Sequence, residues 1–230
     1  MQASFVGPPR PSRSRPVTGL AADVLRRRGG QRALTLGTAV LFLAGVALFA
    51  YPVGTDVYGH FRQGQLQETF TDPGVRQAYR RHQVRLGSGL TLLRIPRIGL
   101  KVLVVEGTTA DALRAGAGHY VETPLPGETG NVAIAGHRTT FGRPFNRLDE
   151  LRPGDLATLQ TPVTTYTYRA VPAFGGHANP WVVAPDDFSV LAAAPTPELT
   201  LTTCTPKGSA SHRLILRLAL VGSAPRPAGG

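Results

Sequence analysis

An uncharged apolar run near the N-terminus is the feature that most constrains how this chain can fold. Residues 33–53 read ALTLGTAVLFLAGVALFAYPV and contain no charged side chain. As a helix, at about 1.5 Å per residue, the run would be roughly 30 Å long, which matches the hydrocarbon core of a bilayer. It is longer than the apolar part of an ordinary signal peptide, and the best small-residue cleavage pattern, at residues 45–47, lies inside it. We therefore interpret the run as an uncleaved membrane anchor, with a signal peptide as the alternative.

The charges around the apolar run predict its orientation. Seven arginines and one acid precede it, so residues 1–32 carry +6 of the net charge of +11, and only Arg62 follows within about twenty residues. The positive-inside rule then leaves the N-terminus in the cytoplasm and everything after Val53 outside. The arginine-rich arm could instead bind nucleic acid, but attraction to the inner leaflet is the simpler account because the arm adjoins the span. We expect a single-pass protein of the cell membrane that contacts the lipid bilayer and no nucleic acid.

The remainder of the chain has the composition of a stalk followed by one β-rich domain. Residues 54–90 are polar, and a short helix is expected within them, over about residues 75–84. From residue 91, short apolar or alternating runs are broken by glycine and proline, which predicts many short strands in a closed or nearly closed barrel. Strands are expected near 92–95, 102–106, 131–135, 156–160, 164–171, 199–204 and 213–221, and short helical pieces near 109–115, 145–150 and 185–193. The expected division is an arm (1–32), an anchor (33–53), an extracellular stalk (54–90), a barrel (91–222) and a flexible tail (223–230).

The last two expected strands place a cysteine beside an arginine. Alternation puts Leu199 and Leu201 on one face of the first strand and Cys204 on the other. The returning strand carries leucines at 214, 216, 218 and 220 on one face and Arg213 and Arg217 on the opposite face. If both leucine stripes enter one core, Cys204 and Arg213 share the outer face of adjacent antiparallel strands. A thiolate stabilised by a guanidinium suits nucleophilic chemistry, although an inert cysteine beside a solvated arginine fits this pattern equally well.

A nucleophile needs a proton partner, and His137 is the candidate among the six histidines. It follows the apolar run 132–135 through Gly136, so a buried strand would deliver it to a rim. A histidine that merely caps a strand end is the alternative. His119, flanked by glycines, is a candidate for a supporting or substrate-contacting role. The other four are expected at the surface: His60, His82, His177 and His212.

These residues, in this order, resemble the sortases, the cysteine transpeptidases of Gram-positive cell envelopes. The chain reads TLTTC over residues 200–204, Arg213 follows nine positions after the cysteine, and Gly136-His137-Arg138 lies upstream. The resemblance extends over residues 92–220. The stretches IPRIGL (95–100), AGHRTT (135–140) and LRPGD (151–155) are most similar to the class E sortases of actinobacteria.

The resemblance implies a closed eight-stranded sortase barrel and a role for each of three side chains. Cys204 would attack a C-terminal sorting signal similar to LAxTG between its Thr and Gly, and His137 would protonate the departing amine. Arg213 would donate hydrogen bonds to the substrate carbonyl or oxyanion. The protein substrate would be a secreted protein that carries the signal, and the acceptor a peptidoglycan stem-peptide amine.

The resemblance also suggests substrate contacts and leaves alternatives open. Tyr120, Thr203 and His119 are candidates to bind the signal, and for Thr203 a purely structural role is equally compatible. No cofactor or metal is expected, and no calcium, since few acids lie near the long connection 172–197. Residues 72–74 read DPG, similar to the lid of pilus-building sortases but without its aromatic residue, so we interpret them as a turn. A pilin polymerase, a hydrolytic cysteine peptidase and a non-catalytic envelope scaffold remain alternatives.

Overall fold

The structure, a computed structural model, describes residues 18–70 and 72–226. Its internal contacts divide the chain into two units, Met1–Phe49 and Ala50–Gly230. Much of the predicted arginine-rich arm (1–32) therefore lies outside the described residues, as do residues 227–230 of the predicted tail.

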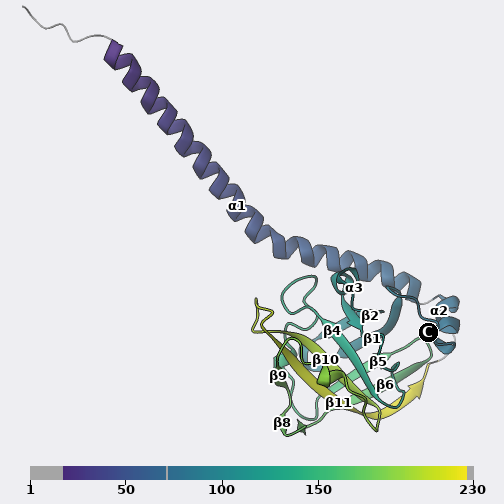
Figure 1. Cartoon of the computed structure of the whole chain (residues 1–230). Helices are drawn as coiled ribbons and strands as arrows, with labels where there is room; N and C mark the ends of the chain where they lie inside the picture. The colour runs from purple at the N-terminus through teal and green to yellow at the C-terminus, as the bar shows by residue number, and fades with distance from the viewer. Residues whose placement is uncertain (1–17, 71, 227–230) are drawn as a thin grey trace, which may run out of the picture. The chain divides into compact units, whose positions relative to one another are not determined.

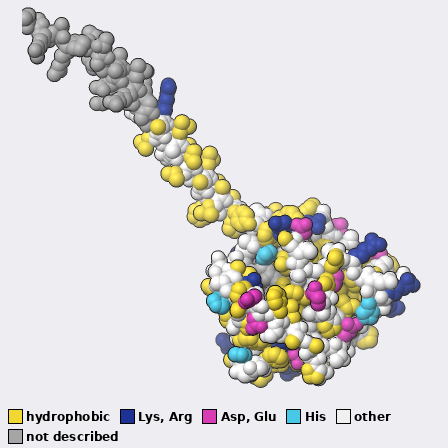
Figure 2. All heavy atoms as spheres, in the orientation of Figure 1, with side chains coloured by type: hydrophobic (Ala, Val, Ile, Leu, Met, Phe, Trp, Pro, Cys, Tyr) yellow, Lys and Arg dark blue, Asp and Glu magenta, His cyan; other side chains and the backbone are white. Residues whose placement is uncertain are grey.

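The predicted N-terminal helix is present. Helix α1 runs from Thr18 to Phe70, and its part from Gln31 onward includes a stretch long and apolar enough to cross a membrane. The large apolar side chains of this stretch are exposed, with Phe49 82% accessible, and Figure 2 shows them along the helix. The apolar helix candidate is thus confirmed, while its orientation across a membrane stays a prediction.

Eight strands of the second unit close into a barrel (Figure 1). The hydrogen-bonded order is β10-β4-β3-β2-β1-β5-β6-β11, and β11 pairs back onto β10. The pairs β2–β3 and β4–β10 are parallel, and the other pairs in the barrel are antiparallel. The eight strands are β1 (Gly89–Ile95), β2 (Leu100–Glu106), β3 (Ala117–His119), β4 (Asn131–Gly136), β5 (Leu156–Gln160), β6 (Thr164–Ala170), β10 (Glu198–Thr205) and β11 (His212–Pro225). The closed eight-stranded barrel is therefore confirmed.

Short helices and minor strands complete this unit. The helices are α2 (Pro73–Arg80), α3 (Ala110–Ala115), η1 (Pro96–Ile98), η2 (Leu148–Glu150) and η3 (Phe188–Leu191). Helix α3 begins as the sequence predicts, because the Thr109 side chain accepts a hydrogen bond from the N–H of Ala112. The minor strands are β7 (Ala173–Phe174), β8 (His177–Ala178) and β9 (Trp181–Val183). Strand β9 adds to the outer side of β11, whereas β7 and β8 form a separate hairpin.

The core contains the two leucine stripes predicted for the last hairpin. Leu199 and Leu201 from β10 and Leu214, Leu216 and Leu218 from β11 belong to one buried cluster. Because side chains alternate along a strand, the odd-numbered partners on β11, including Arg213, lie on the other face. The predicted placement of the two faces is correct.

The segment interpreted as a stalk is helical and packs onto the barrel. Leu66 and Phe70, one helical turn apart at the end of α1, are buried against Leu103 of β2. The Gln63 amide donates to the carbonyls of Leu103 (3.0 Å) and Ala115 (2.6 Å), and its oxygen accepts from the Leu103 N–H (2.7 Å). Residues 50–70 are thus part of the compact unit. At the other end, residues 223–225 extend β11 and pair with β6.

The connection between β6 and β10 covers the outer face of the hairpin. Arg217, placed on that face by its alternation, is only 2% exposed. Its Nη1 contacts Glu198 Oε2 and its Nη2 donates to the Val190 carbonyl, both at 3.0 Å. The guanidinium also lies 4.1 Å from the centroid of the Phe174 ring. The long connection therefore buries most of this face and leaves Cys204 and Arg213, at its end, partly accessible.

Removal of the partner of the buried Arg217 is expected to destabilise the barrel. Glu198→Ala leaves a buried guanidinium without its carboxylate, which typically costs about 3 kcal/mol of unfolding free energy. Chemical denaturation of the full chain in detergent measures the change. Glu150→Ala, which removes the carboxylate of the exposed Arg147–Glu150 pair, is the matched control and should leave stability nearly unchanged. Equal stability of the two variants would contradict this role of the buried pair.

Candidate active site

Cys204 and Arg213 lie directly opposite each other near the ends of β10 and β11. The antiparallel register pairs them residue for residue, and both side chains are half-buried. Directly opposed residues have Cβ atoms about 5 Å apart and point to the same face of the sheet. The thiol and the guanidinium therefore share one surface, as the sequence predicts.

The parallel neighbour of β10 brings His137 to the same end of the barrel. Strand β4 pairs with β10 up to Ala135 opposite Thr202. Two further residues along each chain bring His137 level with Cys204. The Thr203 hydroxyl bridges the two strands at this point, because it donates to the Gly136 carbonyl over 2.7 Å. Three neighbouring strands thus deliver the cysteine, the histidine and the arginine to one place.

Arg213 is held by the hairpin that joins its strand to β10. Its Nη1 donates to the carbonyls of Ala210 (2.9 Å) and His212 (3.1 Å). A guanidinium has further N–H donors on its other two nitrogens. The two bonds therefore orient the group and leave donors available for a substrate. Such a fixed, charged donor beside a thiol suits stabilisation of negative charge on a substrate oxygen.

Tyr120 is a fourth side chain of this cluster. It follows β3, and its N–H donates to the Ala133 carbonyl over 3.0 Å. Burial raises the pKa of the Tyr120 phenol, the Arg213 charge opposes that rise, and Cys204 and Glu122 add to it. The hydroxyl thus lies within electrostatic reach of both Cys204 and Arg213. It stays protonated at neutral pH and is available as a hydrogen-bond donor.

Two of the predicted substrate-contacting residues lie inside the protein instead. His119 is 1% exposed, and its Nδ1 lies 3.0 Å from Glu106 Oε2. Its Nε2 lies 3.1 Å from both the Pro124 carbonyl oxygen and the Thr123 hydroxyl, so both ring nitrogens have protein partners. Thr203 is 2% exposed and bonded to Gly136. Their burial favours supporting roles, His119 beneath the turn that carries Tyr120 and Thr203 between the two strands.

Arg138 was not singled out from the sequence, although it follows His137 directly. It is 5% exposed, and its Nη1 donates to the Cys204 carbonyl (3.3 Å) and to the Thr205 hydroxyl (2.8 Å). Its Nη2 forms an ion pair with Asp149 at 2.9 Å. The residue beside the histidine therefore binds the backbone of the cysteine. The histidine–arginine pair in the sequence was the available signal, but only the fold shows what the arginine contacts.

Burial sets the electrostatics of His137. Its half-buried ring lies against the Phe141 ring, with 5.3 Å between the centroids. Burial lowers the pKa of His137 below its usual 6.5, and the positive charge of Arg114 lowers it further. The imidazolium form is therefore disfavoured in the free protein.

A pH-rate profile should reveal this depressed pKa. A bell-shaped kcat/KM profile reports the essential groups of the free enzyme, and its acidic limb follows the lower of the two pKa values. The lower of the two pKa values cannot exceed the pKa of His137. We therefore expect the midpoint of the acidic limb below pH 6.5. Arg114→Ala removes the smaller cause, so the pKa of His137 should rise and remain below 6.5. An acidic midpoint clearly above 6.5 would contradict this account.

The structure is a closed mixed barrel with a cysteine, a histidine and an arginine near one end, which is the arrangement of a thiol-containing site. A family model described as a sortase domain matches residues 93–221, which is more than half of the chain. The chain belongs to the sortase family. Among residues 18–70 and 72–226, no group of three His, Cys, Asp or Glu side chains is arranged to hold a metal ion.

Several relatives and solved structures are similar to the chain. Sortase SrtE1 of Streptomyces coelicolor is 29% identical over 224 residues, which are 91% of this chain and 61% of that protein. Sortase D of Bacillus subtilis is 36% identical over 134 residues, covering 56% of this chain and 63% of that protein. The chain thus spans about three fifths of the length of these curated relatives.

The structural neighbours include sortases E, as the sequence predicts. The structure of sortase E from Streptomyces avermitilis is 36% identical with a TM-score of 0.54, and the match covers 64% of this chain and 96% of that one. Sortase E1 from S. coelicolor, solved with a tripeptide in its active site, is 32% identical with a TM-score of 0.56, covering 63% and 94%. A sortase D5 transpeptidase from Clostridium perfringens has a TM-score of 0.60 at 28% identity, covering 72% and 99%.

Proposed function

We propose that this protein is a membrane-anchored cysteine transpeptidase. It cleaves an LAxTG-like sorting signal of a secreted protein between Thr and Gly and transfers that protein to a peptidoglycan amine. One observation carries the proposal: Cys204 lies directly opposite Arg213, and the neighbouring strand β4 ends at Gly136, one residue before His137. Membership of the sortase family supports it, as does the tripeptide seen in the active site of S. coelicolor sortase E1.

The first half-reaction forms a thioester. The Cys204 thiolate attacks the carbonyl carbon of the signal's Thr, a C–S bond forms, and the carbonyl electron pair moves onto oxygen. Arg213 donates hydrogen bonds to that oxyanion, and the Tyr120 hydroxyl, which is electrostatically coupled to Cys204 and Arg213, contacts the same peptide. When the intermediate collapses, the C–N bond breaks and the His137 imidazolium gives its proton to the leaving Gly amine. The products are a thioacyl enzyme and a released C-terminal peptide.

The second half-reaction transfers the acyl group. An amine of a peptidoglycan stem peptide attacks the thioester carbon, and neutral His137 removes its extra proton. The C–S bond breaks, an amide forms, and the Cys204 thiolate and His137 imidazolium are restored. Each cycle leaves the number of protons on the enzyme unchanged.

The apolar helix supports a location at the membrane. With the arginine-rich arm in the cytoplasm, the catalytic barrel lies outside the cell, where both the secreted substrate and the wall amine are found. The anchor also holds the enzyme beside the newly exported substrate.

Peptide ligation tests the proposal. Full-length protein in detergent is incubated with LAxTG or LPxTG peptides and with glycine or a diaminopimelate-like amine, and products are followed by mass spectrometry. An amine adduct cut after Thr, absent with Cys204→Ala, is the expected result. Cleavage without adduct would identify a hydrolytic peptidase instead. If no peptide is cut and iodoacetamide leaves folded Cys204 unlabelled, the transferase proposal fails and a scaffold role takes its place.

A further inference from the structure

The loop after His137 lies between the ring of that histidine and helix α1. The loop is closed at its base by the hydrogen bond from the Phe145 N–H to the His137 carbonyl, 3.1 Å. At its tip, the Phe141 ring packs on the His137 ring, with centroids 5.3 Å apart. On its other side Phe141 meets the edge of the Tyr58 ring of α1, with centroids 6.3 Å apart. One aromatic side chain therefore touches both the helix and the proposed catalytic histidine.

The tip of this loop has an unfavourable backbone conformation. Phe141, Gly142 and Arg143 have φ angles of 53°, 75° and 47°, so three successive residues are left-handed. Two of them carry a Cβ, for which this region is disfavoured. Such a conformation persists only when its surroundings hold it.

Asp56 of helix α1 supplies the contacts that hold the tip. Its Oδ1 accepts the Gly142 N–H over 3.1 Å, and its Oδ2 forms an ion pair with Arg143 Nη2 at 2.8 Å. One carboxylate thus binds two of the three left-handed residues. Gly59, one turn later, allows the close approach, because a Cβ there would lie 3.0 Å from the Phe141 carbonyl carbon.

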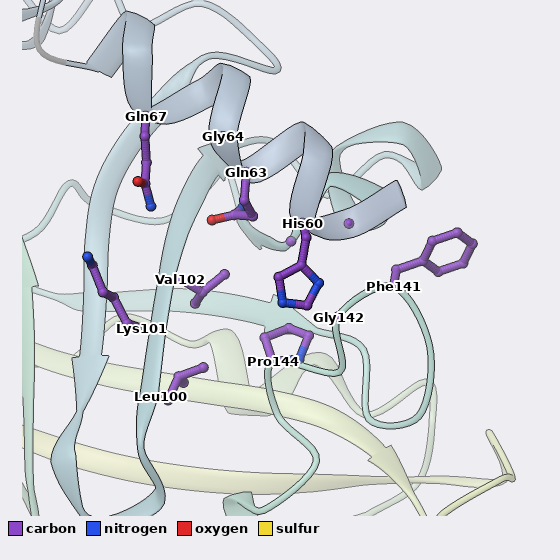
Figure 3. A pocket seen from close by; sticks show the side chains of 12 residues that line it. His60, Gln63, Gly64, Gln67, Leu100, Lys101, Val102, Phe141, Gly142 and Pro144 are labelled. Carbon is purple, nitrogen blue, oxygen red and sulfur yellow. The ribbon is translucent and has the colours of Figure 1, made fainter. Parts of the chain in front are cut away.

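A cavity lies beside the loop tip, so close packing does not hold the tip on that side. Between α1, the start of β2 and the loop lies a cavity of about 300 Å³, lined by Gln63, Leu100, Gly142 and Pro144 among others (Figure 3). The Phe141 ring is turned away from this cavity, and His60 and Gln63 of α1 reach toward it. Apart from the hydrogen bond from the Arg143 N–H to the Thr140 carbonyl within the loop (3.1 Å), the tip is held by its contacts with Asp56 and Tyr58.

We propose that Asp56 is a positioning residue for His137: it holds the left-handed tip of the 139–144 loop, so that Phe141 packs on the catalytic ring. The proposal rests on the function proposed above in so far as His137 transfers the proton. It assigns a role to the helix segment just after the apolar run, which orients the histidine as well as linking the barrel to its anchor. A ring that loses this support samples orientations unsuited to proton transfer.

Two variants disturb the contact by different means. Asp56→Ala removes the carboxylate, whereas Gly59→Ala keeps it and pushes the helix against the Phe141 backbone. Alanine also favours the helix more than glycine does, so loss of the helix cannot explain its effect. Glu150→Ala is the matched control, since it breaks an exposed carboxylate–arginine pair that does not include the loop residues bound by Asp56. Thermal unfolding of each full-length variant in detergent checks that the barrel is intact.

Kinetics and NMR read out the position of His137. We expect Asp56→Ala and Gly59→Ala to lower kcat for peptide transfer about tenfold, with KM within about twofold. In protein labelled with ¹³C at histidine Cε1, the His137 resonance should move in both variants because the ring current of Phe141 is lost. The resonance is assigned from its absence in His137→Ala. Glu150→Ala should retain wild-type kcat and the wild-type resonance.

A double-mutant cycle tests whether Asp56 acts through Phe141. In a Phe141→Ala background, Asp56→Ala should cause little further loss of kcat and little further movement of the resonance. Additive effects of the two substitutions would overturn the proposal. So would a wild-type His137 resonance in Asp56→Ala and Gly59→Ala. If the wild type transfers no peptide but the resonance still moves in both variants, the positioning contact stands and the proposed transpeptidation fails.

Discussion

Replacing Cys204 by alanine is expected to abolish peptide cleavage and transfer, with kcat/KM reduced by at least about 10³-fold. The reason is chemical: the thiolate forms the covalent intermediate, and no other side chain of the chain can replace a nucleophile that has been removed. Cys204 is the single cysteine in the sequence, so no second thiol confuses the result. Ligation of an LAxTG peptide, followed by mass spectrometry, measures the loss.

Two controls show that the loss is chemical. Cys204→Ala should unfold at the same temperature as the wild type, because the thiol is half-buried at a strand end and outside the buried core. Iodoacetamide should label the wild type once and the variant not at all. If the alanine variant retained cleavage, Cys204 would not be the nucleophile and the assignment of the whole cluster would be wrong.

Substitution of Arg213 is expected to have the second largest effect. In the proposed reaction Arg213→Ala removes the charged donor to the developing oxyanion, and loss of such a donor typically lowers kcat about 10²- to 10³-fold, equivalent to roughly 3–4 kcal/mol. Arg213→Lys should recover only part of this loss, because an ammonium lacks the planar fork of a guanidinium. Single-turnover formation of the thioacyl enzyme measures the acylation step directly.

Substitution of a second arginine distinguishes the role of Arg213 at the oxyanion from a general effect of the protein's net charge. Arg169 is exposed on β6, the strand on the other side of β11, and Arg169→Ala should react as the wild type does. If Arg213→Ala raised KM alone and left the acylation rate intact, Arg213 would bind substrate without stabilising the oxyanion. If Arg169→Ala were equally slow, the effect would reflect net charge.

Much of the barrel was predictable because its signals are local. Alternating side chains located β4, β5, β6, β10 and β11 within a few residues, and Thr109 marked the start of α3. The three-residue strand β3 was missed because it is too short for any periodicity to show. Strand β9 was missed for another reason: it lies within a connection whose residues order only against β11. The packing of the stalk onto the barrel was missed because the apolar residues that bury its helix face, such as Leu66 and Phe70, are few.

In the candidate site, too, some features have local sequence signals and others do not. Cys204, Arg213 and His137 were predicted from strand alternation, the apolar run before the histidine and the resemblance to the sortases. The surroundings of these residues were not found. Alternation placed Arg217 on the face away from the leucines but did not show that this face is buried, and the sequence did not show that both ring nitrogens of His119 have partners inside the protein. Asp56 lies some eighty positions before the loop it holds, and no local pattern connects the two.

The sequence alone therefore determined the apolar helix, the β-rich class of the domain and the three residues proposed for the chemistry. Each depends on the order of neighbouring residues: apolar length, period-two alternation and a short motif. Only the tertiary structure decided that β10 pairs with β4 and β11 with β6, that the β6–β10 connection buries Arg217, and that Asp56 reaches the loop beside His137. Those outcomes depend on contacts between residues distant in the chain, which arise only when the strands pair and the helix packs against them.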